Sequence, residues 1–225
     1  MDIEQARFNM IERQVRPWGV HDARVLALLS MLRREDFVPA AWRMQAFADM
    51  EIPLRDDAGA LAAGQLMLSP RVEARMLQEL DLDGHGKVLE IGTGSGFVAA
   101  LLGHSAQRVI SAELDAELAQ RAQQNLHRAG VMNVHVRAGD GLNIALSEGP
   151  FDAIVLTGAV TQIPEVLIDQ LKPGGRLFAF VGTAPVMRAT LLRRDTGGAS
   201  FTQPWEATVP MLRGALAPEN LASRG

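Results

Sequence analysis

The chain has 225 residues, of which 48% are apolar and 21% are charged, so it is long and apolar enough to build a folded core. Its 22 basic and 26 acidic side chains give a net charge of −4, which argues against sequence-independent binding to nucleic acid. The lack of cysteine excludes disulfides, thiolate metal sites and a cysteine nucleophile.

The sequence contains no pattern typical of a membrane segment or a leader peptide. Charges are interspersed through the N-terminus, and the longest apolar runs, such as residues 25–32, are far shorter than the about 20 residues that span a bilayer. The five histidines show no metal-ligand spacing. We therefore expect a cytoplasmic protein without a metal, nucleic-acid or membrane partner, and composition does not predict its oligomeric state.

Residues 1–80 are predicted to form a helical extension. Helices are expected over residues 8–15 and 22–32 and from Pro70 to about Leu80. Phe8, Ile11 and Val15 are spaced by three and four, which marks them as the buried stripe of the first helix. Residues 55–64 have small side chains and no clear period, so residues 55–68 are expected to form either a lid over a ligand or a plain long loop.

Residues 81–214 are predicted to form an α/β core. Strands are expected over residues 88–91, 109–112, 134–136, 152–156 and 176–181, and most of them are separated by helical stretches. This alternation predicts βαβ units in a doubly wound, mostly parallel sheet. Residues 187–194 and 205–212 are expected to form a terminal strand pair, and residues 215–225 a flexible tail.

A glycine-rich loop follows the first strand of this core. Residues 88–97 read VLEIGTGSGF, a buried strand followed by Gly92, Gly94 and Gly96 and then a helix. Glycines without Cβ atoms let the backbone approach a ligand closely, and such a loop lies beyond the carboxyl ends of the strands. The loop therefore predicts a nucleotide-type site, although glycines that merely turn a strand into a helix would give the same pattern.

The details of the loop favour S-adenosyl-L-methionine. A phosphate-binding Walker loop ends in Gly-Lys-Ser/Thr, whereas this loop ends in Gly96 and Phe97, and its G-x-G-x-G spacing departs from the dinucleotide G-x-G-x-x-G. Glu90 precedes the first glycine by two residues, where an anion would repel a pyrophosphate but suit a cation. S-adenosyl-L-methionine carries a sulfonium and an amino group and no phosphate.

Two further acids follow the next two strands. Glu113 ends the second strand, where a carboxylate can accept both ribose hydroxyls, and Leu114 follows it. Asp140 follows the third strand, and its oxygens can accept a hydrogen bond from an adenine amino group. The alternatives are an acid at a helix start for Glu113 and an ordinary Asp-Gly turn at Asp140 and Gly141.

Several segments resemble the protein-L-isoaspartate (D-aspartate) O-methyltransferase family. The resemblance covers about residues 8–182, and the N-terminal block, more than the glycine loop, points to this family. The resembling segments are MIERQVRPWGVHDARVLALL, REDFVP at 34–39, AFAD at 46–49, IPL at 52–54, the glycine loop, GDG at 139–141, PFDAIVLTGA at 150–159 and QLKPGGRLFAFVG at 170–182.

This resemblance implies a fold, a cofactor and a reaction. It implies a seven-stranded doubly wound sheet whose last strand is antiparallel, with S-adenosyl-L-methionine as methyl donor and S-adenosyl-L-homocysteine as product. It implies that the α-carboxyl of isoaspartyl residues in damaged proteins is esterified, which begins their repair. The implied cofactor-binding residues are Glu90, Gly92, Thr93, Gly94, Gly96, Glu113, Leu114, Asp140 and Gly141.

The chain departs from the family in the segment before the helix at Pro70. The family has Gln-Thr-Ile-Ser-x-Pro-His, with its serine at the methyl-transfer site, whereas residues 65–71 read QLMLSPR. The family serine therefore falls on Leu68. Ser69, one position later, is expected either to replace it as the catalytic residue or to cap the following helix. Arg71 is expected either to pair with an acidic acceptor or to lie solvated at the helix start.

A second departure and three rival functions remain. A glutamine that the family has after the strand ending at Gly182 is missing, and Val186 to Arg188 stand near that place. One rival keeps the cofactor but methylates a small apolar molecule bound by Leu66, Met67 and Leu68. Another is a non-catalytic adenosyl-ligand-binding regulator. An NAD-dependent oxidoreductase is the third, and it would lack a tyrosine for proton relay because the chain has none.

Overall fold

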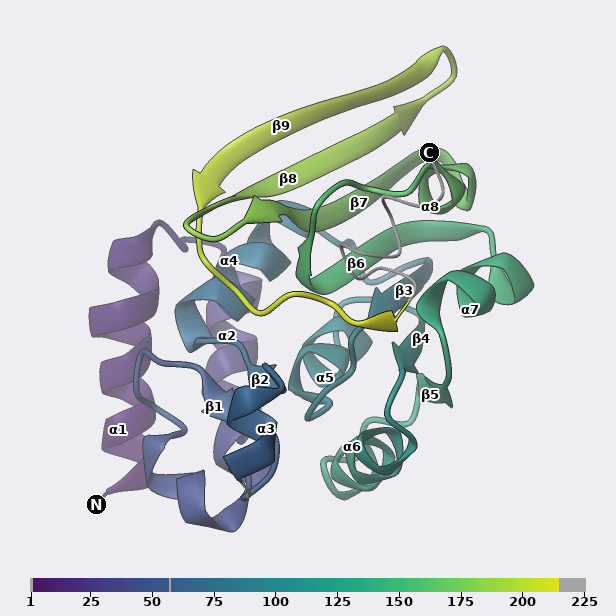
Figure 1. The fold of residues 1–225 in the computed structure, drawn as a ribbon. Coiled ribbons are helices and arrows are strands. Elements are labelled where there is room, and N and C mark those ends of the chain that lie inside the picture. Colours follow the sequence, from purple (N-terminus) through teal and green to yellow (C-terminus); the bar gives the residue numbers. More distant parts are fainter. Residues whose placement is uncertain (1, 57, 215–225) are drawn as a thin grey trace.

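The computed structural model describes residues 2–56 and 58–214, which form a central sheet with helices on both faces (Figure 1). The flexible tail expected at residues 215–225 lies outside the described residues. Seven strands form the sheet in the order β5-β4-β3-β6-β7-β8-β9. Their bounds are β3 Lys87–Ile91, β4 Arg108–Glu113, β5 Val134–Ala138, β6 Phe151–Val160, β7 Leu171–Thr183, β8 Val186–Asp195 and β9 Gly198–Glu206.

The first five strands of the sheet order run parallel, as the alternating pattern predicted. β3 pairs with both β4 and β6 in parallel, and the sheet order switches direction between the neighbouring strands β3 and β6. At such a switch point the loops beyond the carboxyl ends of the strands separate and leave a crevice. The seven-stranded, doubly wound α/β class that we expected is confirmed.

The end of the sheet differs from the expectation in two respects. The second of the two terminal strands was predicted at residues 205–212, but β9 covers Gly198–Glu206. β8 pairs antiparallel with both β7 and β9, so the strand that runs against the others is the second to last and not the last. A tight reversal between β8 and β9 brings the chain back earlier, and residues after 206 are left free to run elsewhere.

Two apolar clusters flank the sheet, because its residues alternate between its faces. Val88 faces the cluster formed with α4 and α5, whereas Leu89 and Ile91 face the cluster formed with α7 and α8. The helices of the core are α4 Pro70–Leu80, α5 Phe97–Gly103, α6 Ala116–Arg128, α7 Gly141–Glu148 and α8 Glu165–Asp169.

The N-terminal extension packs on the same face as α4 and α5 (Figure 1). It contains α1 Ile3–Met10, a π-helical turn at Ile11–Val15, α2 Ala23–Met31 and short 3₁₀ turns at Arg16–Trp18, Arg34–Asp36 and Ala40–Gln45. Ile11 and Val15 are buried as predicted, but Phe8 is 59% exposed and Arg7 is buried in its place. Arg7 is held there by Glu35, at 2.7 Å.

The segment expected as a lid or a plain loop contains regular structure. Its alanine-rich part forms α3 Ala58–Ala62, as the high helix propensity of alanine allows. β2 Leu66–Met67 then pairs antiparallel with β1 Ile52–Pro53. This two-stranded sheet is separate from the seven-stranded sheet. It positions Gln65 beside the carboxyl ends of the parallel strands of the seven-stranded sheet.

Candidate active site

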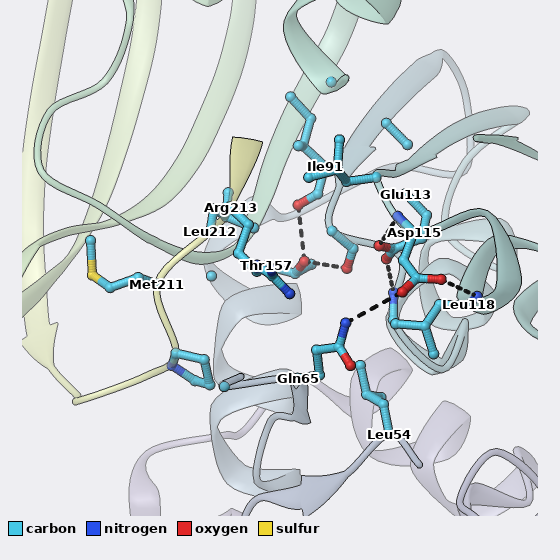
Figure 2. A pocket seen from close by; sticks show the side chains of 18 of the residues that line it. Leu54, Gln65, Ile91, Glu113, Asp115, Leu118, Thr157, Met211, Leu212 and Arg213 are labelled. Atoms are coloured by element: carbon cyan, nitrogen blue, oxygen red, sulfur yellow. Dashed lines mark hydrogen bonds between the residues drawn. The ribbon is translucent and has the colours of Figure 1, made fainter. Parts of the chain in front are cut away.

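A cavity of about 330 Å³ opens at the carboxyl ends of the parallel strands (Figure 2). Strand ends, the glycine loop, the β1–β2 segment and the chain after β9 surround it. The lining residues are Leu54, Gly64, Gln65, Leu66, Ile91, Gly92, Gly94, Ala112, Glu113, Leu114, Asp115, Leu118, Gly139, Asp140, Gly141, Thr157, Gly158 and 210–213. Six of the nine predicted cofactor residues belong to this lining.

The glycine loop forms the floor of the cavity. Gly92 has φ +102° and Gly94 has φ +52°, conformations that residues with a Cβ atom adopt only with strain. Thr157, in the carboxyl-terminal half of β6, points its single hydroxyl hydrogen at two carbonyl oxygens, those of Ile91, at 3.0 Å, and Gly92. A Cβ atom at Gly92 would overlap the Thr157 hydroxyl. Glycine is therefore required here both by the backbone angle and by the close approach of β6.

Glu113 brings a carboxylate to the cavity wall. It is 9% exposed and accepts hydrogen bonds from the N–H groups of Gly94, at 2.8 Å, and Asp115, at 3.1 Å. Burial raises the pKa of the Glu113 carboxyl, and these backbone donors oppose the rise. The carboxylate therefore links the glycine loop to the start of α6 and still faces the cavity.

Asp140, Gly141 and Leu114 lie at the β4–β5 side of the cavity. Asp140 is the N-cap of α7 and accepts a hydrogen bond from the Leu142 N–H at 2.9 Å. Gly141 packs so closely on Ile91 that a Cβ atom would lie 2.5 Å from its Cγ2. The Asp-Gly pair therefore starts a helix rather than forming an isolated turn.

Glu90, Thr93 and Gly96 do not line the cavity. Glu90 is fully buried on the face that packs against α4 and α5, and one carboxylate oxygen accepts a hydrogen bond from Ser111. Burial raises the pKa of Glu90 to about 8. Thr93 contacts the Ser111 hydroxyl, and Gly96 packs on Ala122 of α6. These three residues therefore hold the glycine loop in place through contacts outside the cavity.

The segment that departs from the family pattern is only partly at the cavity. Leu66 lines it, whereas Met67 and Leu68 are 5% and 4% exposed and pack into the core, so the three do not form one apolar pocket. Ser69 occupies the N-cap position of α4, is 8% exposed, makes no capping hydrogen bond through its side chain and lies outside the lining. Arg71 forms an ion pair with Asp49, at 3.1 Å, instead of facing the cavity.

The sequence left a lid and a plain loop open for residues 55–68, and it did not predict the contacts that fasten this segment beside the cavity. Arg55 donates to Asp115 and to Glu117 of α6, and the latter bond is 2.8 Å long. The Gln65 amide donates to the same Asp115 carboxylate at 3.5 Å. These contacts fasten the segment between β1 and β2 to the core beside Glu113. Thr157 was also missed, although its place at a strand's carboxyl end is the signal that could have identified it.

The chain after β9 forms the remaining wall. The Leu212 N–H donates to the Ala159 carbonyl, and the Ala159 N–H donates to the Pro210 carbonyl, both at 2.8 Å. Figure 1 shows this segment crossing the carboxyl ends of the strands. Leu212 approaches both Gly92 and Gly158, where added Cβ atoms would lie 3.0 Å from it. Nothing in the apolar run of residues 208–212 distinguished a cavity wall from a strand.

The lining chemistry fits an adenosyl ligand with positive charge. Its acids are Glu113, Asp115 and Asp140, and the glycine loop offers close approach without a Walker lysine. Among residues 2–56 and 58–214, no group of three His, Asp or Glu side chains is placed to hold a metal ion. In the same residues, no helix combines the length and apolar character needed to cross a membrane.

Comparison with known proteins supports this chemistry. The family model for protein-L-isoaspartate(D-aspartate) O-methyltransferase matches residues 6–209. The chain is 40% identical over 202 residues to protein-L-isoaspartate O-methyltransferase 1 of Syntrophobacter fumaroxidans, a match that covers 90% of this chain and 91% of the relative. It is 44% identical over 176 residues to the protein-L-isoaspartate O-methyltransferase of Methanoculleus marisnigri, covering 78% and 77%.

Solved structures show the same fold. A protein-L-isoaspartate O-methyltransferase superposes with a TM-score of 0.80 at 24% identity, over 98% of this chain and 68% of the other. A putative protein-L-isoaspartate O-methyltransferase from Plasmodium falciparum, in complex with S-adenosyl-L-homocysteine, gives a TM-score of 0.75 at 15% identity, over 95% and 99%.

Proposed function

Because the chain belongs to the protein-L-isoaspartate(D-aspartate) O-methyltransferase family, we propose that it methylates the α-carboxylate of isoaspartyl residues in proteins, with S-adenosyl-L-methionine as donor. The family match over residues 6–209 is the observation that carries this proposal. Isoaspartyl peptides and proteins are then the substrates. The match also disfavours the NAD-dependent oxidoreductase as a rival.

We assign the donor to the cavity at the carboxyl ends of the strands. Gly92 and Gly94 give it a floor without Cβ atoms, Glu113 accepts from the ribose hydroxyls, and Asp140 accepts from the adenine amino group. Gly141 and Leu114 complete the adenosine side, while Glu90, Thr93 and Gly96 hold the loop in place. When bound, S-adenosyl-L-methionine supplies an electrophilic methyl group on its sulfonium.

The acceptor requires little acid-base chemistry from the protein. A carboxylate has a pKa near 4, so it is already the nucleophile at neutral pH and no general base has to remove a proton. The task of the site is to align the acceptor with the donor and to exclude water, which supplies several kcal/mol of a barrier of this kind. Leu54 and Leu66 from the cover and Leu212 from the C-terminal wall provide apolar surface for this purpose.

The direct test uses the full chain with tritiated S-adenosyl-L-methionine and an isoaspartyl peptide, beside the same peptide with a normal aspartyl residue. We expect base-labile methyl ester to form with the isoaspartyl peptide alone. The variant Arg193→Gln serves as a matched control, because Arg193 is exposed at the opposite end of the sheet. Ester formation no greater than in the blank, with donor binding intact by calorimetry, would remove the repair activity and favour the small-acceptor or regulatory alternative.

A further inference from the structure

The charges that line the cavity are strongly unbalanced. Glu113, Asp115 and Asp140 are its acids, and Arg213 is its single base among the described residues. Asp115 is already paired with Arg55. A lining in which acids outnumber bases suits a donor with a net positive charge, but it repels a second substrate that arrives as an anion.

Arg213 occupies a fixed place at the mouth of this cavity. It follows directly on residues 210–212, whose backbone is hydrogen-bonded to Ala159 at the end of β6. Its side chain is exposed, and Figure 2 shows it directed into the cavity beside Thr157. Across residues 2–56 and 58–214 its guanidinium has no ion-pair or hydrogen-bond partner. Arg213 also lies beyond residues 6–209, which the family model matches.

An exposed guanidinium at the edge of the cavity can be reached from solvent by a protein substrate. Glu113, the proposed partner of the ribose, is only 9% exposed, so the ribose of the donor would be held deeper than Arg213. Guanidinium pairs with carboxylate through two parallel hydrogen bonds, which fixes orientation as well as charge. Resting on the proposed function, we propose that Arg213 binds the acceptor α-carboxylate and selects for anionic acceptors.

The same contact favours release of the product. In the transfer, one acceptor oxygen forms a bond to the methyl carbon while the carbon–sulfur bond breaks, and that electron pair stays on sulfur. No proton moves, and the carboxylate becomes a neutral ester. Arg213 then loses its charged partner, so the methylated peptide binds more weakly than the substrate. A residue with this role affects acceptor affinity far more than the rate of the bound complex.

The test compares wild type with Arg213→Gln, Arg213→Lys and the matched control Arg193→Gln. Initial rates with an isoaspartyl peptide at saturating donor give KM and kcat, and calorimetry gives Kd for S-adenosyl-L-methionine. For Arg213→Gln we expect KM to rise about tenfold, the loss of one charge-assisted pair, with kcat and donor Kd within about twofold. Arg213→Lys should recover most of the affinity, and Arg193→Gln should match wild type.

A neutral analogue distinguishes between two carboxylates as the partner of Arg213, that of the acceptor and that of the donor. A peptide whose isoaspartyl α-carboxyl is an amide should inhibit wild type and Arg213→Gln equally, because it carries no negative charge that could pair with Arg213. An unchanged peptide KM in Arg213→Gln, or a donor Kd that weakens by the same factor as KM, would overturn the assignment. If wild type itself forms no ester, the proposed function fails instead, which is a distinct result.

Discussion

A buried arginine outside the cavity lining tests how the segment before α4 is held in place. Arg34 and Glu73 are each 1% exposed, and the Arg34 Nε lies 3.1 Å from a Glu73 carboxylate oxygen. The same guanidinium donates to the carbonyls of Ala46, at 2.7 Å, and Leu68, at 2.5 Å. One side chain therefore joins α4 to the segment that carries β2 and the cavity wall.

The variant Arg34→Met removes this connection and leaves Glu73 buried without a cation. Breaking a buried ion pair by removing one partner costs about 3–5 kcal/mol, and a carbonyl left without a donor adds about 1 kcal/mol or more. We therefore expect a loss of about 4–6 kcal/mol, a large part of the 5–15 kcal/mol typical of a domain. The double variant Arg34→Met/Glu73→Met buries no charge and should recover about 2–4 kcal/mol of the loss.

Urea unfolding at pH 7.5 and pH 5.5 measures both effects. Burial raises the pKa of Glu73 to about 7 even beside Arg34, above its value of about 4.5 when unfolded. A group whose folded pKa is raised stabilises the fold most at low pH, so the single variant should recover stability as pH falls toward 5.5. A loss of less than about 1 kcal/mol in the free energy of unfolding of the single variant at pH 7.5, or a double variant less stable than the single one, would refute the role of this pair.

Four further variants test individual residues. Glu90→Gln should stabilise the protein, and the gain should grow from pH 5.5 to 8.5. Burial raises the pKa of Glu90 to about 8, so the wild-type protein loses up to about 1.4 kcal/mol of stability per pH unit as pH rises from about 4.5. A stability difference between variant and wild type in urea that stays the same at every pH would contradict this. Gly92→Ala should cost about 2–4 kcal/mol in stability and weaken donor binding, since its positive φ and Thr157 leave no room. Glu113→Ala should weaken calorimetric donor binding by about 1–3 kcal/mol, and unchanged affinity would leave it a structural role only. Ser69→Ala should change both melting temperature and kcat little, because the Ser69 hydroxyl makes no capping hydrogen bond and Ser69 does not line the cavity. A large rate loss at unchanged stability would restore it as catalytic.

The parallel half of the sheet and the adenosine side of the site were predictable because their signals are local. Short apolar strands alternate with helical stretches, and three successive strands each have an acid close to their carboxyl end: Glu90 within β3, Glu113 at the end of β4 and Asp140 after β5. In a parallel sheet those strand ends meet at one edge, so Glu113 and Asp140 had to converge near the glycine loop. Glu90 shows the limit of this reasoning. Its side chain points to the opposite face of β3, because alternation along a strand decides the face.

The walls of the cavity were not predictable because they depend on contacts between distant segments. The apolar run after residue 206 reads equally as a strand or as a wall, and only the early reversal between β8 and β9 decides. Charged residues such as Arg34 and Glu73 are normally exposed, and nothing local shows that they bury each other. The exposure of Phe8 and the burial of Arg7 were missed for the same reason, because the Glu35 that pairs with Arg7 lies 28 positions away in the sequence.

The departure at Leu68 is consistent with methyl transfer once the nature of the acceptor is considered. A hydroxyl acceptor would need a base to remove its proton, and the loss of a serine beside that base would remove chemistry. A carboxylate has already lost its proton at neutral pH, so the site has to bind the acceptor, align it with the donor and exclude water. Leu68 is buried, its carbonyl is held by Arg34, and the adjacent β2 places Leu66 on the cavity wall. The segment therefore positions the cavity wall without needing the hydroxyl.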